Sequence, residues 1–217
     1  MGQHTEALMD TVTFMKEAGI LSNKVLRAVS ELVLKLDTLS PTQLVDFTLM
    51  YSSSEMQSAI DISEHVSNIE NALIANSNKF TISNFANICS VVAFDDARDG
   101  EREVFNLQLP VFLHQNQDRV KEWLASDRII EMQDFVYISA AYLSMYDDGR
   151  VPADLLSLFE HTIEVNSSFI DASQAIYLAQ IFSKCGSSYT MEVFDRIIGS
   201  NIEDVPIPQV FQAYLAF

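Results

Sequence analysis

The chain has 217 residues, of which 48% are hydrophobic and 20% are charged, with only 6 Gly and 5 Pro. This composition excludes collagen-like and disordered classes, and so few turn-forming residues leave little room for an all-β fold. The formal net charge of -17 at pH 7 disfavours nucleic acids and anionic membranes as partners, because affinity for phosphate depends mainly on Lys and Arg.

Amphipathic helices are predicted along the whole chain, because apolar residues recur at helical spacing between short polar stretches. In chain order the predicted helices cover residues 5–17, 23–36, 39–51, 55–75, 80–92, 102–125, 130–142, 153–165, 170–182, 189–198 and 205–217. The breaks between them are rich in Ser, Asp, Gly and Pro, which favour turns. These predictions place the chain in the all-α class.

Five of these segments, beginning at residues 39, 80, 130, 170 and 205, align with one another without gaps. Each opens with an apolar residue, called here the anchor: Leu39, Phe80, Ile130, Ile170 and Val205. The next residue is typical of a helix start: Ser40, Thr81, Glu131, Asp171 and Pro206. Apolar residues recur five, eight and twelve positions after each anchor, which is helical spacing and indicates a repeat.

Successive anchors are 41, 50, 40 and 35 residues apart, which fits two helices and their turns per repeat. One hairpin cannot bury its own apolar face, so neighbouring hairpins are expected to stack. We therefore predict a single-domain α-solenoid over residues 1–217, with about five stacked helical hairpins. The approximate units are 22–52, 53–94, 101–146, 152–184 and 188–217, and residues 1–19 form an N-terminal capping helix. An irregular helical bundle is the alternative, but the shared anchor and cap positions favour the repeat.

The segments LVDFTLMY, FANICSVV, FVYISAAY and AIYLAQIF, at residues 44–51, 85–92, 135–142 and 175–182, carry a family resemblance. The pattern resembles the degenerate helical-hairpin repeats of organellar proteins, the octotricopeptide and heptatricopeptide families and the repeat region of FAST-kinase-like proteins. The resemblance covers residues 22–217 and includes no invariant catalytic or binding residue. It implies a mitochondrial or plastid α-solenoid that either binds organellar RNA or is an architectural subunit of a ribosome or respiratory complex.

A polar stripe is the first candidate binding surface. Polar residues lie four and seven positions after each anchor, one turn apart on one helix face. They are Gln43, Asp46, Asn84, Asn87, Asp134, Tyr137, Gln174, Tyr177, Gln209 and Gln212. Asn, Gln and Tyr can hydrogen-bond to or stack on bases, which would suit RNA. Two Asp and no Lys or Arg in the stripe favour instead a solvated or protein-contacting face.

The last predicted helix is the second candidate surface, since Phe211, Tyr214 and Phe217 would leave an apolar face uncovered. The ends of a solenoid need a cover, so we expect a partner or further residues to bury this face. From Glu131 onward the sequence has three Lys or Arg against twelve Asp or Glu. The C-terminal half is therefore expected to contact a basic protein surface.

No catalytic or metal-binding motif is recognisable in the sequence. It lacks the P-loop, dinucleotide-binding and nucleophile-elbow patterns, and its four His occur singly: His4, His65, His114 and His161. Residues 95–100 could begin a calcium loop, but Ala97 and Asn106 occupy positions that require ligands, so a solvated turn is favoured. Cys89 and Cys185 are expected to be buried free thiols in helices. We predict no enzyme activity, no cofactor and no metal.

The predicted function is that of a non-enzymatic helical-repeat scaffold, an interaction subunit of a mitochondrial assembly of the respiratory-complex or ribosome type. Its expected partners are protein subunits with basic surfaces. The alternative is an organellar RNA-binding repeat protein that acts in RNA processing or translation. No apolar stretch is long enough to span a bilayer, so no membrane insertion is expected. The first residues lack signal-peptide and transit-peptide patterns, so the chain is expected to be cytoplasmic or to lack its presequence here.

Overall fold

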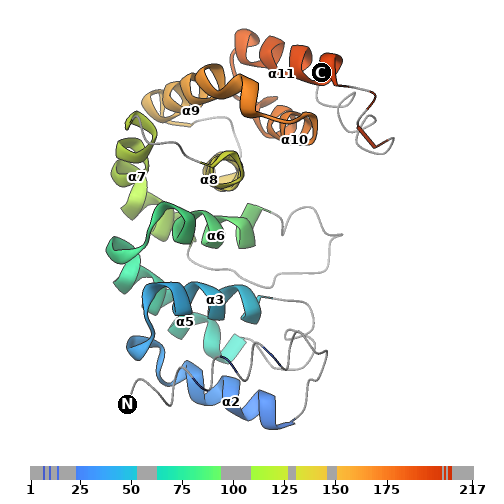
Figure 1. The fold of residues 1–217 in the computed structure, drawn as a ribbon. Helices are drawn as coiled ribbons and strands as arrows, with labels where there is room; N and C mark the ends of the chain where they lie inside the picture. The colour runs from blue at the N-terminus through green and yellow to red at the C-terminus, as the bar shows by residue number, and fades with distance from the viewer. Residues whose placement is uncertain are drawn as a thin grey trace. The chain divides into compact units, whose positions relative to one another are not determined.

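The structure, a computed structural model of the chain, describes residues 23–52, 63–93, 109–126, 131–145 and 151–201, together with residues 7, 10, 14, 203, 205 and 206. These residues form α-helices and short 3-10 turns, with no strand among them (Figure 1). The predicted all-α class is therefore confirmed. Most of the predicted N-terminal capping helix and residues 207–217 lie outside the described part.

The chain divides into two compact units, residues 1–116 and 117–217, and each is described by itself. Unit 1 contains α2 (Asn23–Val33), α3 (Pro41–Tyr51), α5 (Ser63–Asn76), α6 (Ile82–Ala93) and the first part of α7 (Leu109–Ala125). In this unit α3 packs on α5 and on α6, and α2 packs on α5. The predicted helices 55–75 and 102–125 are described only from residues 63 and 109 onward.

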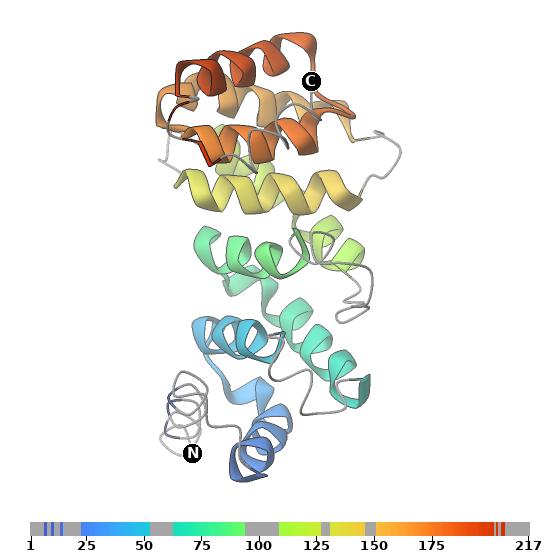
Figure 2. The same ribbon diagram turned by 90° about the vertical axis from the view of Figure 1, so that its right-hand side faces the viewer.

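Unit 2 contains the rest of α7, followed by α8 (Met132–Met145), α9 (Ala153–Asn166), α10 (Ala172–Phe182) and α11 (Ser188–Ser200). Here α10 packs on α8 and on α11, and α11 packs on α9 (Figure 2). Alternate helices in the chain therefore lie side by side, α8 with α10 and α9 with α11. This is the neighbour relation that stacked hairpins produce.

The core of both units consists of the apolar positions that recur after each anchor. The described anchors Leu39, Phe80, Ile170 and Val205 are all at most 7% exposed. The positions five, eight and twelve residues further on are also buried wherever the structure describes them: Leu44, Phe47, Tyr51, Phe85, Ile88, Phe135, Ile138, Tyr142, Ala175, Leu178 and Phe182. The predicted apolar face of these helices is thus confirmed.

Aromatic pairs join helices that follow one another along the chain. The ring centroids are 5.1 Å apart in Phe85–Phe112, 6.0 Å in Phe135–Phe159 and 5.9 Å in Phe182–Phe194. Such pairs contribute about 0.5–1.5 kcal/mol beyond the burial of their area. In each case an apolar position that follows an anchor packs on an aromatic residue of the next helix, so the repeat pattern positions this contact.

A short 3-10 turn precedes the anchor at three helix junctions, a feature that the sequence did not predict. These turns are Leu36–Thr38, Ser77–Lys79 and Ser167–Phe169. The first of them lies where helix 23–36 was expected to end, so the α-helix itself stops at Val33. A 3-10 turn tightens the chain at the end of a helix and turns it toward the next element.

An asparagine lies four residues before three of the anchors, at two of these junctions and at the end of α11. The Nδ2 atoms of Asn76, Asn166 and Asn201 each donate a hydrogen bond, 2.9 Å long, to the backbone carbonyl four residues earlier. Carbonyls at a helix C-terminus lack partners within the helix, so this side chain supplies one of them. The asparagine thus recurs before three of the five anchors, while Lys35 and Ser126 occupy this position before the other two.

The two cysteines differ in their surroundings. Cys89 is buried in α6, as predicted, and burial raises the pKa of its thiol well above the ordinary value. Cys185 was expected in the same setting, but it is half-buried and lies in the turn after α10, which ends at Phe182. Burial, and then the charge of Glu160, raise the pKa of this thiol.

Candidate binding surface

In two repeats the first residue of the polar stripe helps to cap its own helix. Ser40 Oγ accepts from the Gln43 N–H at 3.3 Å, and Gln43 Oε1 accepts from the Ser40 N–H at 3.0 Å. Asp171 and Gln174 form the same reciprocal pair at 2.8 and 3.1 Å. These are capping boxes, which satisfy amide groups that the first helical turn leaves open. Gln43 and Gln174 of the expected binding stripe are therefore engaged in starting helices.

Asn84 and Asp134 occupy the same position in the other two described repeats. The Asn84 N–H donates to Thr81 Oγ1 at 3.1 Å, and the Thr81 N–H donates to Asn84 Oδ1 at 3.4 Å. Asn84 is only 9% exposed and Asp134 only 8% exposed. Side chains that are buried to this extent offer little surface to a ligand, which weakens the prediction that Asn84 and Asp134 contact one.

One contact links the stripe between neighbouring helices. Gln174 Nε2 on α10 donates to Gln133 Oε1 on α8 at 3.5 Å, the long end of hydrogen-bond geometry. Gln133 was not among the predicted stripe residues, although it lies next to Asp134. The structure thus brings α8 and α10 together along the stripe, as stacking predicts, but partly through a neighbouring residue.

The second stripe position is more open. Asp46 is exposed, while Asn87, Tyr137 and Tyr177 are half-buried. Partial burial raises the pKa of the Asp46 carboxyl, so the fold does not favour its charged form. Tyr137 and Tyr177 occupy equivalent positions on the packed helices α8 and α10. The remaining predicted residues, Gln209, Gln212, Phe211, Tyr214 and Phe217, lie outside the described residues.

An exposed apolar surface in unit 2 was missed by the sequence analysis. Val165, Phe169 and Tyr189 are 62%, 73% and 50% exposed, and we call them the α9 patch. Val165 is in the last turn of α9, Phe169 is in the 3-10 turn that follows, and Tyr189 is in the first turn of α11. Val165 and Phe169 lie five and one residues before the anchor Ile170, outside the spacing that predicts burial.

Glu160 holds the start of α11 against α9. Its Oε1 accepts hydrogen bonds from the Ser187 N–H at 2.6 Å and from the Thr190 hydroxyl at 3.0 Å. Ser187 Oγ caps the same helix by accepting from the Thr190 N–H at 3.2 Å. A carboxylate at a helix N-terminus also interacts favourably with the helix dipole. Glu164, one turn further along α9, accepts from the Tyr189 hydroxyl at 3.2 Å.

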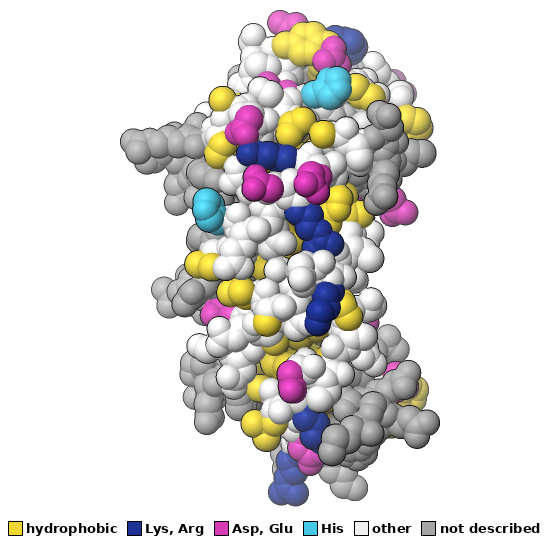
Figure 3. Space-filling view, turned by 90° about the vertical axis from the view of Figure 1, so that its left-hand side faces the viewer, with side chains coloured by type: hydrophobic (Ala, Val, Ile, Leu, Met, Phe, Trp, Pro, Cys, Tyr) yellow, Lys and Arg dark blue, Asp and Glu magenta, His cyan; other side chains and the backbone are white. Residues whose placement is uncertain are grey.

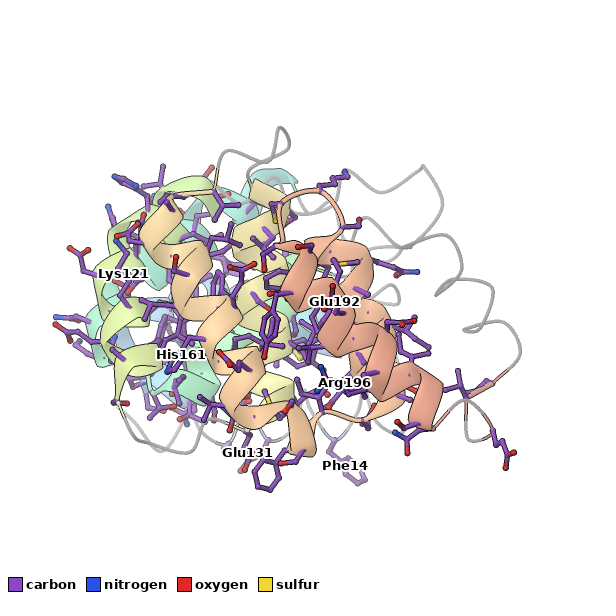
Figure 4. The ribbon with its side chains drawn as sticks, turned by 90° about the horizontal axis from the view of Figure 1, so that it is seen from above. Phe14, Lys121, Glu131, His161, Glu192 and Arg196 are labelled. Carbon is purple, nitrogen blue, oxygen red and sulfur yellow. The ribbon has the colours of Figure 1, made fainter. Side chains whose placement is uncertain are left out.

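Charge on the described surface is mixed in sign. Figure 3 shows basic, acidic and apolar side chains interspersed on one face of the molecule. Lys121 of α7 forms an ion pair with Asp154 of α9, and its hydrogen bond lowers the pKa of that carboxyl. Seen from above, α9 and α11 run side by side, with His161 on the one and Glu192 on the other (Figure 4).

Within the described ranges, no group of three or more His, Cys, Asp or Glu could hold a metal ion. His114 and His161 are both exposed. Residues 95–100, the rejected calcium loop, lie outside the described part. None of the helices that the structure describes has the length and apolar character needed to cross a membrane.

Comparison with family models, curated proteins and solved structures finds no match to this chain. The class that the described residues define is the all-helical one.

Proposed function

We propose that this chain is a non-enzymatic helical-repeat scaffold, an interaction subunit of a larger multiprotein assembly, whose hairpins stack within each unit as an α-solenoid. The recurring junction supports the solenoid. At the α5–α6 and α9–α10 junctions the same order of features appears: a helix, an asparagine that caps its end, a 3-10 turn, a buried anchor and a capped helix. A junction repeated in this way supports consecutive hairpins with similar geometry.

The hydrogen bonds of the polar stripe are the observation that best supports a scaffold role. Its Gln and Asn side chains were the candidates for recognising a ligand, and Gln43, Asn84 and Gln174 instead bond to their own helix starts. This supports a structural role for the stripe. The apolar and acidic side chains of the α9 patch and its surroundings remain available for contacts with another protein.

The partners that we propose are protein subunits with basic surfaces. Twelve Asp or Glu against three Lys or Arg from Glu131 onward would steer such partners toward unit 2. A mitochondrial location, in an assembly of the respiratory-complex or ribosome type, rests on the resemblance to organellar helical-hairpin repeats. An acidic subunit would neutralise basic neighbours there.

A second candidate function is RNA binding through the stripe, and one observation favours it. Tyr137 and Tyr177 lie at the same register on the packed helices α8 and α10, an arrangement that could stack single-stranded bases. Against it, Asp46 and Asp134 belong to the same stripe, and the chain has a net charge of -17. The scaffold role accounts for both features better.

Affinity purification of the tagged full-length chain from mitochondria tests the proposal. Half of the extract is treated with nuclease before capture. We expect the same set of basic proteins in both halves, released when the salt concentration is raised, because screening weakens charge contacts. Recovery of the chain alone would refute the scaffold role, and loss of all partners on nuclease treatment would favour the RNA-binding alternative.

A further inference from the structure

We propose that the α9 patch, together with Glu164, is the docking site for a cationic amphipathic helix of a partner protein. This inference rests on the proposed scaffold function and deepens it, because it names the surface and the chemistry of the partner. It concerns unit 2 alone and uses none of the residues predicted as binding sites from the sequence.

The first observation is that the exposed apolar side chains of unit 2 cluster. Val165, Phe169 and Tyr189 are the large hydrophobic residues that lie exposed in the described part of this unit. Phe169 follows Val165 by four residues, and the Tyr189 hydroxyl bonds to Glu164, the residue before Val165. The end of α9 and the start of α11 thus contribute to one surface. Apolar side chains that gather at one place on a protein surface mark an interaction site.

The second observation is the sign of the surrounding charge. Residues 151–183 contain no Lys or Arg, whereas Asp154, Glu160, Glu164 and Asp171 all lie in this segment. Glu164 is exposed and within hydrogen-bond distance of the patch residue Tyr189. Asp154 is paired with Lys121 and Asp171 caps α10, so a partner that buries this apolar surface would bring its own edge against Glu160 and Glu164. Lys or Arg at that edge would pair with them, whereas Asp or Glu would be repelled.

The third observation is the shape of the apolar surface. Val165 lies in the last turn of α9 and Phe169 in the 3-10 turn that follows, so the two form a short apolar row where α9 ends. A helix whose apolar residues recur every three or four positions can pack its own ridges beside such a row. A second copy of this chain fits poorly, because it carries the same acidic surroundings and a net charge of -17.

Fluorescence anisotropy with a designed peptide tests the docking site. The probe is a labelled amphipathic helix of about 18 residues, with Leu on one face and Lys on the other, a length at which helices become stable. It is titrated with the full-length chain. The control peptide has Glu in place of every Lys. We expect saturable binding of the Leu/Lys peptide and no binding of the Leu/Glu peptide.

Two pairs of variants locate the binding. The double variant Val165→Ser with Phe169→Ser is compared with Leu34→Ser, since Leu34 is 79% exposed and also lies five residues before its anchor. Glu164→Gln is compared with Glu192→Gln, an exposed acid on α11. We expect the double variant to weaken binding about tenfold or more and Glu164→Gln to weaken it about threefold. The two control variants should bind like the natural chain.

These side chains are exposed, so the variants should keep their fold, and circular dichroism and thermal unfolding confirm this before binding is measured. Equal affinity across all variants, or equal binding of both peptides, overturns the inference. Dimers that form in light scattering and disappear in the double variant overturn it too, because the occupant is then a second copy. If partners still co-purify with the double variant, the docking site alone is refuted. If the natural chain purifies without partners, the proposed function is refuted.

Discussion

Gly186 lies in the turn after α10, where a β-carbon would be 2.9 Å from the carbonyl oxygen of Phe182 and 3.1 Å from its Cβ atom. That oxygen already accepts hydrogen bonds from the N–H groups of Cys185 and Gly186, at 3.0 and 2.6 Å. Phe182 is fully buried and packs on Phe194. The added methyl group of Gly186→Ala would have to displace the turn or this core residue. We therefore expect a loss of about 1–3 kcal/mol in the free energy of unfolding.

Gly199→Ala is a matched control, because it makes the same substitution in the same unit. Gly199 lies in the last turn of α11, is exposed, and a β-carbon there would meet no atom within 4 Å. Alanine is favoured over glycine in a helix by about 0.5–1 kcal/mol. Gly199→Ala should therefore stabilise the chain or leave it unchanged near the helix end. The same methyl group is thus expected to act in opposite directions at the two positions.

Urea unfolding followed by tryptophan fluorescence measures both effects in the right unit. Trp123 is the only Trp in the chain and lies in α7, in the part of that helix that belongs to unit 2. The midpoint for Gly186→Ala should fall and that for Gly199→Ala should not, with the slopes unchanged. If Gly186→Ala were as stable as the natural chain, the close turn against Phe182 would be wrong.

Three further substitutions test the junctions of unit 2. Asn166→Ala removes the hydrogen bond to the Thr162 carbonyl and should lower the free energy of unfolding by about 1 kcal/mol. The control Glu122→Ala, on the exposed side of α7 in unit 2, should change it by less than about 0.5 kcal/mol. Glu160→Gln should lower the free energy of unfolding by about 0.5–1 kcal/mol at low salt, since it removes a charge from the start of α11. Urea unfolding at high salt should show a smaller loss, and a loss that does not change with salt would refute an electrostatic role. Asp154→Asn tests the ion pair with Lys121, which lowers the pKa of the carboxyl below its ordinary value of 3.8. Stabilisation by Asp154 is then complete above the ordinary pKa and is lost as pH falls through the lower pKa of the folded state. The difference in the free energy of unfolding between variant and natural chain should therefore disappear on acidification, and a difference that stays constant with pH would contradict this.

The predictable part of the fold consists of features that depend on nearby residues. Burial of Leu44, Phe85 and Phe135 follows from helical periodicity, and the helix starts at Ser40 and Asp171 follow from their side chains. Both depend on a few neighbouring positions, so the sequence alone could indicate them.

The capping role of two stripe residues could have been predicted from the sequence. Ser40 and Gln43, like Asp171 and Gln174, are three residues apart at a helix start, the spacing of a capping box. That spacing predicts hydrogen bonds within the helix start, and the expectation of a solvated, protein-contacting or base-reading stripe did not include these bonds. The Asn at positions 76, 166 and 201 was a second overlooked signal, because it recurs four residues before three of the five anchors.

Other features could not be foreseen, because they depend on which helices become neighbours. Glu160 bonds to Ser187 across 27 residues of sequence, and no local pattern connects the two. The contact that brings Tyr189 of α11 to Glu164, beside Val165, spans 25 residues of sequence in the same way. Cys185 was expected inside a helix, and the turn that follows Phe182 places it at the surface instead.

The mass of the native particle tests the scaffold role most directly. Mitochondria are lysed gently, the extract is treated with nuclease, and the endogenous chain is followed through a density gradient. We predict that it sediments with a particle many times heavier than its own 24.4 kDa, and that it leaves this particle at high salt. Sedimentation as a free chain in extracts where known assemblies remain intact would contradict the account.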